Sequence, residues 1–134
     1  MNGFGILPAR WAPYLLSIMR MVLAFLFLWH GSQKLFGYPP SDHPPVENWF
    51  TLIGFAGILE FFGGVLLLIG LLTRPVAFLL SGQMAVAYWM AHGPNGILPI
   101  QNGGEMAVLY CFVFLFIAAA GGGPWSLDAT LHGK

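Results

Sequence analysis

Charged side chains are scarce in this chain of 134 residues: five basic and five acidic residues make up 7% of it, and hydrophobic residues make up 57%. Soluble domains carry roughly a quarter charged residues, so this composition cannot cover a surface that faces water. The balance of acids and bases also argues against a nucleic-acid partner, which a strongly basic chain would suggest. We therefore expect an integral membrane protein whose first partner is the lipid bilayer.

Cysteine is nearly absent as well. The single Cys111 lies inside an apolar run, and one thiol alone cannot form an internal disulfide, a dithiol redox pair or a thiolate metal site. This excludes a self-contained thiol–disulfide oxidoreductase. Histidines and carboxylates are present, but not at a spacing typical of a metal-binding motif, so no metal site is predicted.

Long apolar runs are abundant, and four of them approach the length of roughly 20 residues that a bilayer core of about 30 Å requires. We expect an all-α, integral membrane four-helix bundle that forms a single domain over residues 1–134. The N-terminal segment is expected to be retained, because its apolar run exceeds the core of a signal peptide. The expected spans cover residues 14–36, 50–72, 75–91 and 105–120.

The bases of the ends and loops fall on one side of this arrangement. They are Arg10, Arg74 and Lys134, whereas the opposite loops contain neither Lys nor Arg. The positive-inside rule therefore places both termini in the cytoplasm. In the C-terminal tail, Ser126 is expected to cap a short interfacial helix that has Asp128 near its N-terminus.

Ionisable residues within the expected spans would be costly if they faced lipid, so they must face one another or water. Arg20 and Lys34 lie fourteen positions apart and return to nearly the same face of a helix. Glu60 shares a stripe with the small residues Gly57 and Gly64, which allow another helix to approach closely. Each span thus has one polar face, as a bundle with a polar interior requires.

The third span has a polar stripe that includes Ser81, Tyr88 and His92. Gln83 lies off this stripe, and we expect its amide to form a hydrogen bond between helices. Tyr88 lies one turn from His92, so its hydroxyl could bind a carbonyl ligand.

Depth divides the embedded polar residues into two groups. His30 and Lys34 lie near the outer end of the first span, His92 near the outer end of the third, and Glu105 opens the fourth on that side. We expect these four, with Tyr88, to converge on one outer mouth and to act as catalytic groups.

Arg20 and Glu60 lie deeper, and with Tyr88 they are the expected cofactor-binding residues. Glu60 is expected to face the interior of the bundle with Arg20, His30 or Lys34 as its partner. An ion pair of Arg20 with Glu60 that only fixes the helix register is an equally open interpretation.

Several different short motifs occur along the chain from about residue 20 to residue 128, in a fairly specific order and spacing. They are WHGSQKLF at 29–36, LEFFGG at 59–64, GLLTRP at 70–75, MAVAY at 84–88, AH at 91–92, NGGE at 102–105 and GPWSLD at 123–128. Together they resemble the DoxX family of small bacterial membrane proteins. The family often has an acid where this chain has Gln83, so one ionisable member of the polar network is missing here.

The resemblance implies a four-span bundle in the bacterial inner membrane and a loose association with redox chemistry. The family takes its name from a subunit of a thiosulfate:quinone oxidoreductase, so a quinone is the implied cofactor. Family membership predicts the fold more strongly than the function.

Three functions are compatible with these residues. A quinone-linked subunit needs an apolar slot and proton donors such as histidines and carboxylates, and without flavin, haem or iron–sulfur motifs it needs a redox protein partner. The alternatives are a non-catalytic accessory subunit of a larger membrane complex and a small-molecule or proton carrier. The small-residue helix faces also allow an oligomer.

Overall fold

The computed structural model describes residues 3–132, and those residues are helical, with no strand. This confirms the all-α prediction. Lys134, one of the bases behind the predicted orientation, lies outside the described residues. The elements are η1 Ala9–Trp11, α1 Ala12–Phe36, α2 Leu52–Ile69, α3 Thr73–Ala87, η2 Tyr88–His92, η3 Gly93–Asn95, α4 Pro99–Asn102, α5 Glu105–Ala120 and α6 Leu127–His132.

The four long helices coincide with the four expected apolar runs to within a few residues. The third run is covered by α3 together with η2, a single π-helical turn that continues it to His92. The connection after His92 contains the short helices η3 and α4.

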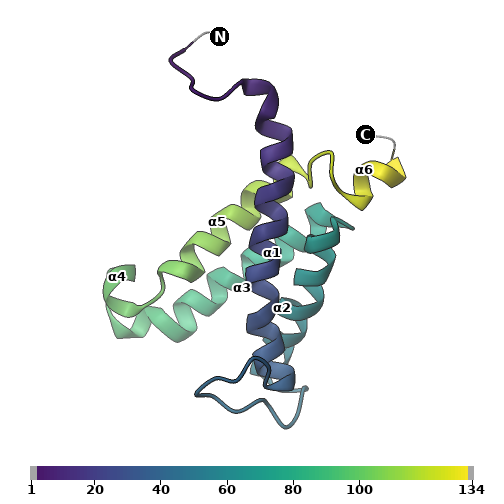
Figure 1. Cartoon of the computed structure of the whole chain (residues 1–134). Helices are drawn as coiled ribbons and strands as arrows, with labels where there is room; N and C mark the ends of the chain where they lie inside the picture. The colour runs from purple at the N-terminus through teal and green to yellow at the C-terminus, as the bar shows by residue number, and fades with distance from the viewer. Residues whose placement is uncertain (1–2, 133–134) are drawn as a thin grey trace.

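Helices α1 and α2 pack together as one antiparallel pair, and α3 and α5 form a second pair (Figure 1). The two pairs meet near the end of the molecule that carries α6 and diverge towards the opposite end. Buried apolar side chains from all four helices fill the junction; they include Ala24, Phe27, Leu67, Ala77, Leu80, Phe114 and Ile117.

Close approach of α1 to α2 depends on glycine. A side chain at Gly31 would collide with the backbone of Gly57, Glu60 and Phe61, and one at Gly57 would press on Lys34 and on a neighbouring leucine. The predicted role of Gly57 as a small residue at a helix contact is therefore confirmed. This contact fixes how far α1 can slide along α2.

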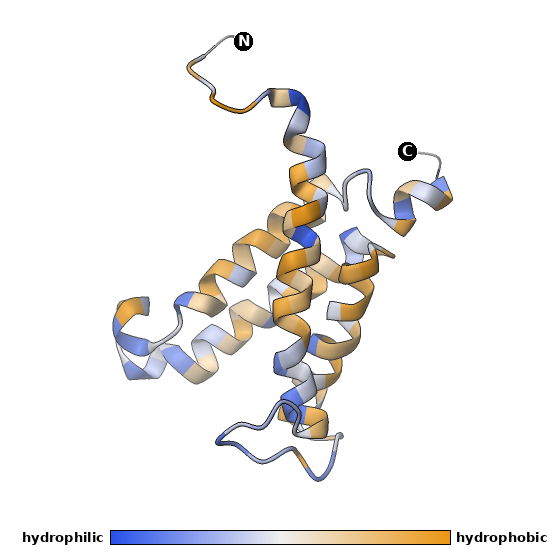
Figure 2. Cartoon of the chain, viewed as in Figure 1, coloured by the Kyte–Doolittle hydropathy of each residue, from blue (hydrophilic) through white to orange (hydrophobic). Residues whose placement is uncertain are grey.

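Hydrophobic residues dominate the surfaces of the helices (Figure 2). Among residues 3–132, two helical stretches, Ala9–Phe36 and Leu52–Ile69, are long and apolar enough to cross a membrane by length and composition alone, and α5 is apolar but shorter. Helix length and composition thus show two candidate spans where the sequence predicted four.

The C-terminal tail folds back onto the turn between α2 and α3. The Ser126 hydroxyl accepts a hydrogen bond from the Ala129 N–H at 3.1 Å, which confirms the predicted cap of α6. The Asp128 carboxylate accepts hydrogen bonds from the N–H groups of Leu72 and Thr73, both at 2.9 Å. Asp128 thereby satisfies free donors at the start of α3.

Candidate functional site

An ion pair with a buried carboxylate joins α1 to α2 at the diverging end of the molecule. The Lys34 ammonium donates to one Glu60 carboxylate oxygen at 2.7 Å, and the Glu60 side chain is only 5% exposed. Lys34 lies one turn beyond Gly31, where the two helices are closest. The prediction that Glu60 faces the interior with a basic partner is confirmed, and the partner is Lys34.

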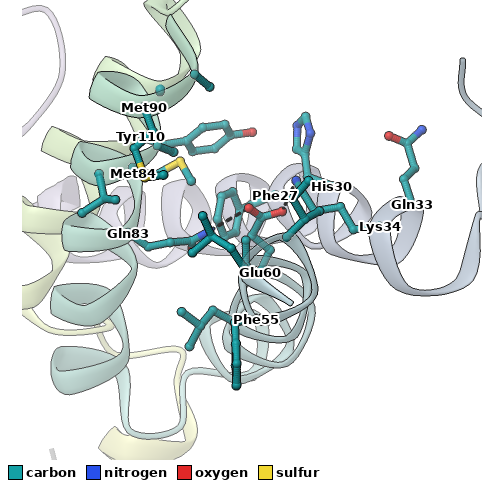
Figure 3. Close-up of a pocket in the computed structure, with 18 of the residues that line it drawn as sticks. Phe27, His30, Gln33, Lys34, Phe55, Glu60, Gln83, Met84, Met90 and Tyr110 are labelled. Atoms are coloured by element: carbon teal, nitrogen blue, oxygen red, sulfur yellow. Dashed lines mark hydrogen bonds and ion pairs between the residues drawn. The ribbon is translucent and has the colours of Figure 1, made fainter. Parts of the chain in front are cut away.

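Helix α3 completes this polar network. The Gln83 amide nitrogen donates to the second Glu60 carboxylate oxygen at 2.7 Å, so Glu60 binds groups from α1 and α3 at once (Figure 3). This confirms the predicted interhelical hydrogen bond of Gln83. The Gln83 amide oxygen is buried and has no hydrogen-bond partner among residues 3–132.

A cavity of about 940 Å³ opens beside the network, between the two diverging helix pairs. Its walls are mainly apolar side chains of α2, α3 and α5. The loop after α1 borders it as well, through Ser41, His43, Pro44 and Val46. The polar side chains that the helices contribute are His30, Gln33, Lys34, Glu60, Gln83, His92 and Tyr110.

Three of the predicted catalytic residues border this one cavity. They are His30, Lys34 and His92, which arrive from α1 and from η2. The ring of His30 lies 6.2 Å from that of Tyr110, centroid to centroid, at an interplanar angle of 81°. These groups supply donors and acceptors to a space that is otherwise apolar.

The structure does not bring Glu105 or Tyr88 into the cavity lining. Glu105 is exposed as the first residue of α5, where its carboxylate is favoured by the helix dipole. The predicted convergence of Glu105 with His30 and Lys34 is therefore not observed.

Tyr88 instead stabilises the loop before α5 by a hydrogen bond. The buried Asn102 side chain donates to the Tyr88 hydroxyl at 2.9 Å and to the Gly96 carbonyl at 3.2 Å. The His92 ring nitrogen Nδ1 lies 3.2 Å from the Asn102 carbonyl oxygen. Sequence reasoning missed Asn102, because an asparagine among glycines and prolines indicates a turn.

Arg20 lies at the other end of the molecule and is not the partner of Glu60. Its guanidinium donates to the carbonyls of Leu67 and Trp125, both at 2.8 Å, and also to that of Gly122. The side chain is 1% exposed and joins α1 to the end of α2 and to the C-terminal tail. The structure therefore places Arg20 apart from the cavity.

The described residues set limits on the chemistry of the site. Among residues 3–132, no group of three or more His, Cys, Asp or Glu side chains is placed to hold a metal ion. The cavity does combine a neutralised ion pair, an imidazole and a phenol with apolar walls. Such a set can bind the oxygen atoms of a neutral ligand and transfer protons to or from them.

Large apolar side chains cover the exterior of the helices, and such a surface is unfavourable in water and favourable in lipid, as in a membrane protein. The family model of DoxX matches residues 15–93, more than half of the chain. The chain belongs to the DoxX family.

Three bacterial proteins are similar to the chain over most of its length, and two of them are named as membrane proteins. An uncharacterized protein of Haemophilus influenzae is 39% identical over 131 residues, covering 93% of this chain and 96% of the relative. The inner membrane protein YqjF of Escherichia coli is 27% identical over 87% of this chain and 92% of its own length. An uncharacterized membrane protein of Mycobacterium tuberculosis is 29% identical over 94% of this chain and 86% of its own length. No solved structure matches the chain.

Proposed function

We propose that this DoxX-family chain is a subunit of the bacterial inner membrane that binds a lipid-soluble quinone in the cavity and exchanges electrons through a redox partner protein. The observation that carries the proposal is the position of the polar network, which lies at one side of an otherwise apolar cavity between two helix pairs. A quinone has the same division between a polar ring and an apolar tail.

The size of the cavity suits such a ligand. Binding sites for small molecules typically measure roughly 300–1,000 Å³, and this cavity measures about 940 Å³. Leu59, Val86 and Met90 are among the apolar wall residues that would contact an isoprenoid tail. Lys34, Glu60 and His30 would face the ring.

Reduction of a quinone to a quinol takes up two electrons and two protons. His30 could hold or transfer a proton, because one imidazole nitrogen donates a proton while the other accepts one. Glu60 is a second candidate proton carrier, and its charge is balanced by Lys34 at 2.7 Å. The sequence has no recognisable motif for a flavin, haem or iron–sulfur cluster, so the proposal assigns the electrons to the partner protein.

The proposal includes four spans with both termini in the cytoplasm. Helix α3 has 15 residues and continues into the 5 residues of η2, which gives about 30 Å of helix at 1.5 Å per residue. Helix α5 has 16 residues and reaches only about 24 Å, so the bilayer would thin around it. The described ends of the chain lie at the same end of the molecule (Figure 1), as an even number of spans requires.

Site-specific labelling tests this topology. In a Cys111→Ser background, Ser41→Cys and Asn95→Cys should react with a membrane-impermeant thiol reagent added outside the cell. Arg10→Cys should react only after the membrane is made permeable. Labelling of Arg10→Cys from outside would overturn the proposed orientation.

The ligand is tested by binding. Full-length protein extracted from its native membrane should co-purify with quinone, and a short-chain alkyl quinone should quench its tryptophan fluorescence with saturation. His30→Ala removes a donor from the cavity and should weaken this binding about tenfold. His132→Ala makes the same change in exposed α6 and should leave the affinity unchanged.

Two results would contradict the proposal. One is a purified chain without quinone whose fluorescence responds to the analogue no more than that of protein-free vesicles does. The other is equal affinity for the His30→Ala variant and the His132→Ala control. Either result would favour the accessory-subunit alternative, in which the polar network only stabilises the bundle.

A further inference from the structure

Tyr110 is a buried polar side chain that neither the sequence motifs nor the ion-pair network accounts for. It lies on α5, is 4% exposed, packs against α1 and borders the cavity. Its hydroxyl forms no hydrogen bond within residues 3–132 and is not among the buried unsatisfied atoms, so it is accessible from the cavity. In Figure 3 the hydroxyl end of the ring points towards His30.

The tyrosine ring is held in place by its neighbours. The ring of Phe114 stacks on it at 5.7 Å and 17°, and the ring of Phe27 packs against it at 5.0 Å and 58°. Phe27 and Phe114 are themselves fully buried in the junction of the helix pairs. The hydroxyl cannot turn away from the cavity unless this packing is lost, so its direction is fixed before any ligand arrives.

The electrostatics of the surrounding groups restrict what the hydroxyl can bind. The nearby charges of Lys34 and Glu60 neutralise each other at 2.7 Å, and the amide nitrogen of Gln83 is already used by Glu60. An anionic head group would bring an unpaired charge into this enclosed space, which costs free energy. A carbonyl or hydroxyl oxygen brings no net charge and can either accept from or donate to a phenol.

We propose that Tyr110 is the ligand-contacting residue on the α5 side of the cavity, and that its hydroxyl selects a ligand whose polar head presents a neutral oxygen atom. The inference rests on the proposed function, because it assigns one side of the same binding site. The ligand then contacts both helix pairs, through Tyr110 on α5 and His30 on α1, whose rings lie side by side.

The substitution Tyr110→Phe tests the inference cleanly, because it removes only the hydroxyl and keeps the ring between Phe27 and Phe114. Affinity for the short-chain quinone should fall about tenfold. The melting temperature in detergent should stay equal, because the hydroxyl forms no hydrogen bond within residues 3–132 and the ring keeps its packing. Tyr14→Phe is the matched control, since Tyr14 packs on Trp125 near α6 and its hydroxyl is remote from the cavity.

A fatty acid with an alkyl chain of equal length tests the selectivity. It should bind wild-type protein at least tenfold more weakly than the quinone and should respond little to Tyr110→Phe. Failure of the wild-type chain to bind the quinone would overturn the proposed function, and this inference with it. Equal quinone affinity of the wild type and Tyr110→Phe, or equal wild-type affinity for fatty acid and quinone, would overturn this inference alone.

Discussion

Arg20 and Lys34 lie on the same face of α1, but their surroundings differ in kind. The donors of Arg20 meet backbone carbonyls of α2 and of the C-terminal tail, and the side chain is closed off from solvent. Lys34 is 34% exposed, has one carboxylate partner, and borders a cavity that is also lined by Gln83, whose buried amide oxygen has no hydrogen-bond partner among residues 3–132. Two basic residues on one helix face therefore have different roles: Arg20 holds the fold together, and Lys34 lies at the proposed binding site.

The comparison shows how to separate a structural charge from a binding site. Around Arg20, the hydrogen bonds of the guanidinium connect α1 to α2 and to the C-terminal tail, which must stay together for the fold. Around Lys34, the charges cancel, yet Gln83 and Tyr110 retain unused hydrogen-bonding capacity beside open space. We regard unused capacity next to a cavity, rather than a buried charge as such, as the mark of a site.

The largest effect is expected from Arg20→Met. The substitution leaves several buried carbonyls without a donor, and we expect a loss of about 3–5 kcal/mol in the free energy of unfolding. Thermal unfolding in detergent measures it. Arg74→Met is the control, because Arg74 also donates to carbonyls, those of Ala118 and Ala119, but is exposed. Similar losses for both variants would remove the distinction between the two ends.

The second largest effect is expected from breaking the Lys34–Glu60 ion pair at the cavity end. Lys34→Met leaves the buried carboxylate of Glu60 without its cation, and should destabilise the protein by on the order of 2 kcal/mol. Adding Glu60→Gln to it removes the unpaired charge and should recover most of the loss. A double variant that is as unstable as the sum of the two single variants would show that the pair is not coupled.

The third prediction concerns pH at the α6 end. Partial burial acts to raise the pKa of Asp128, but the hydrogen bonds from Thr73 and Leu72 outweigh it, and the pKa lies below its ordinary value. The unfolded chain therefore binds the proton first as pH falls, and the stabilisation by Asp128 is lost on acidification through its lowered pKa. Wild type should lose about 1 kcal/mol more than Asp128→Asn over this acid range. Parallel pH profiles of unfolding would contradict the prediction.

The smallest effect is expected from Tyr88→Phe, which distinguishes the two tyrosines at the cavity end. The variant loses the hydrogen bond with Asn102 and should be destabilised by about 0.6 kcal/mol, the mean for such bonds in membrane proteins. Its quinone affinity should equal that of wild type, because Tyr88 does not border the cavity. A greater loss of affinity for Tyr88→Phe than for Tyr110→Phe would restore the role predicted from the sequence.

Much of this architecture followed from the sequence, because lipid and helix geometry act on local patterns. Apolar runs located α1, α2, α3 and α5, since backbone groups in an apolar environment must form hydrogen bonds within their own segment. The helical period predicted that Glu60 lies on an inward face with Gly57 and Gly64. It also made Lys34 one of the candidate partners of Glu60. The cap formed by Ser126 and the interhelical hydrogen bond of Gln83 followed from the same local rules.

Only the tertiary structure decided which base pairs with Glu60. Arg20 and Lys34 share one face, so periodicity cannot tell them apart, and the choice depends on how far α1 slides along α2. The contact of Gly31 with α2 sets that offset and brings Lys34, rather than Arg20, to the carboxylate. Likewise, Tyr110 follows an apolar pattern within α5, and its hydroxyl borders a cavity only because the two helix pairs diverge. A sequence fixes the faces of its helices, whereas the offsets and angles between helices result from packing many side chains together.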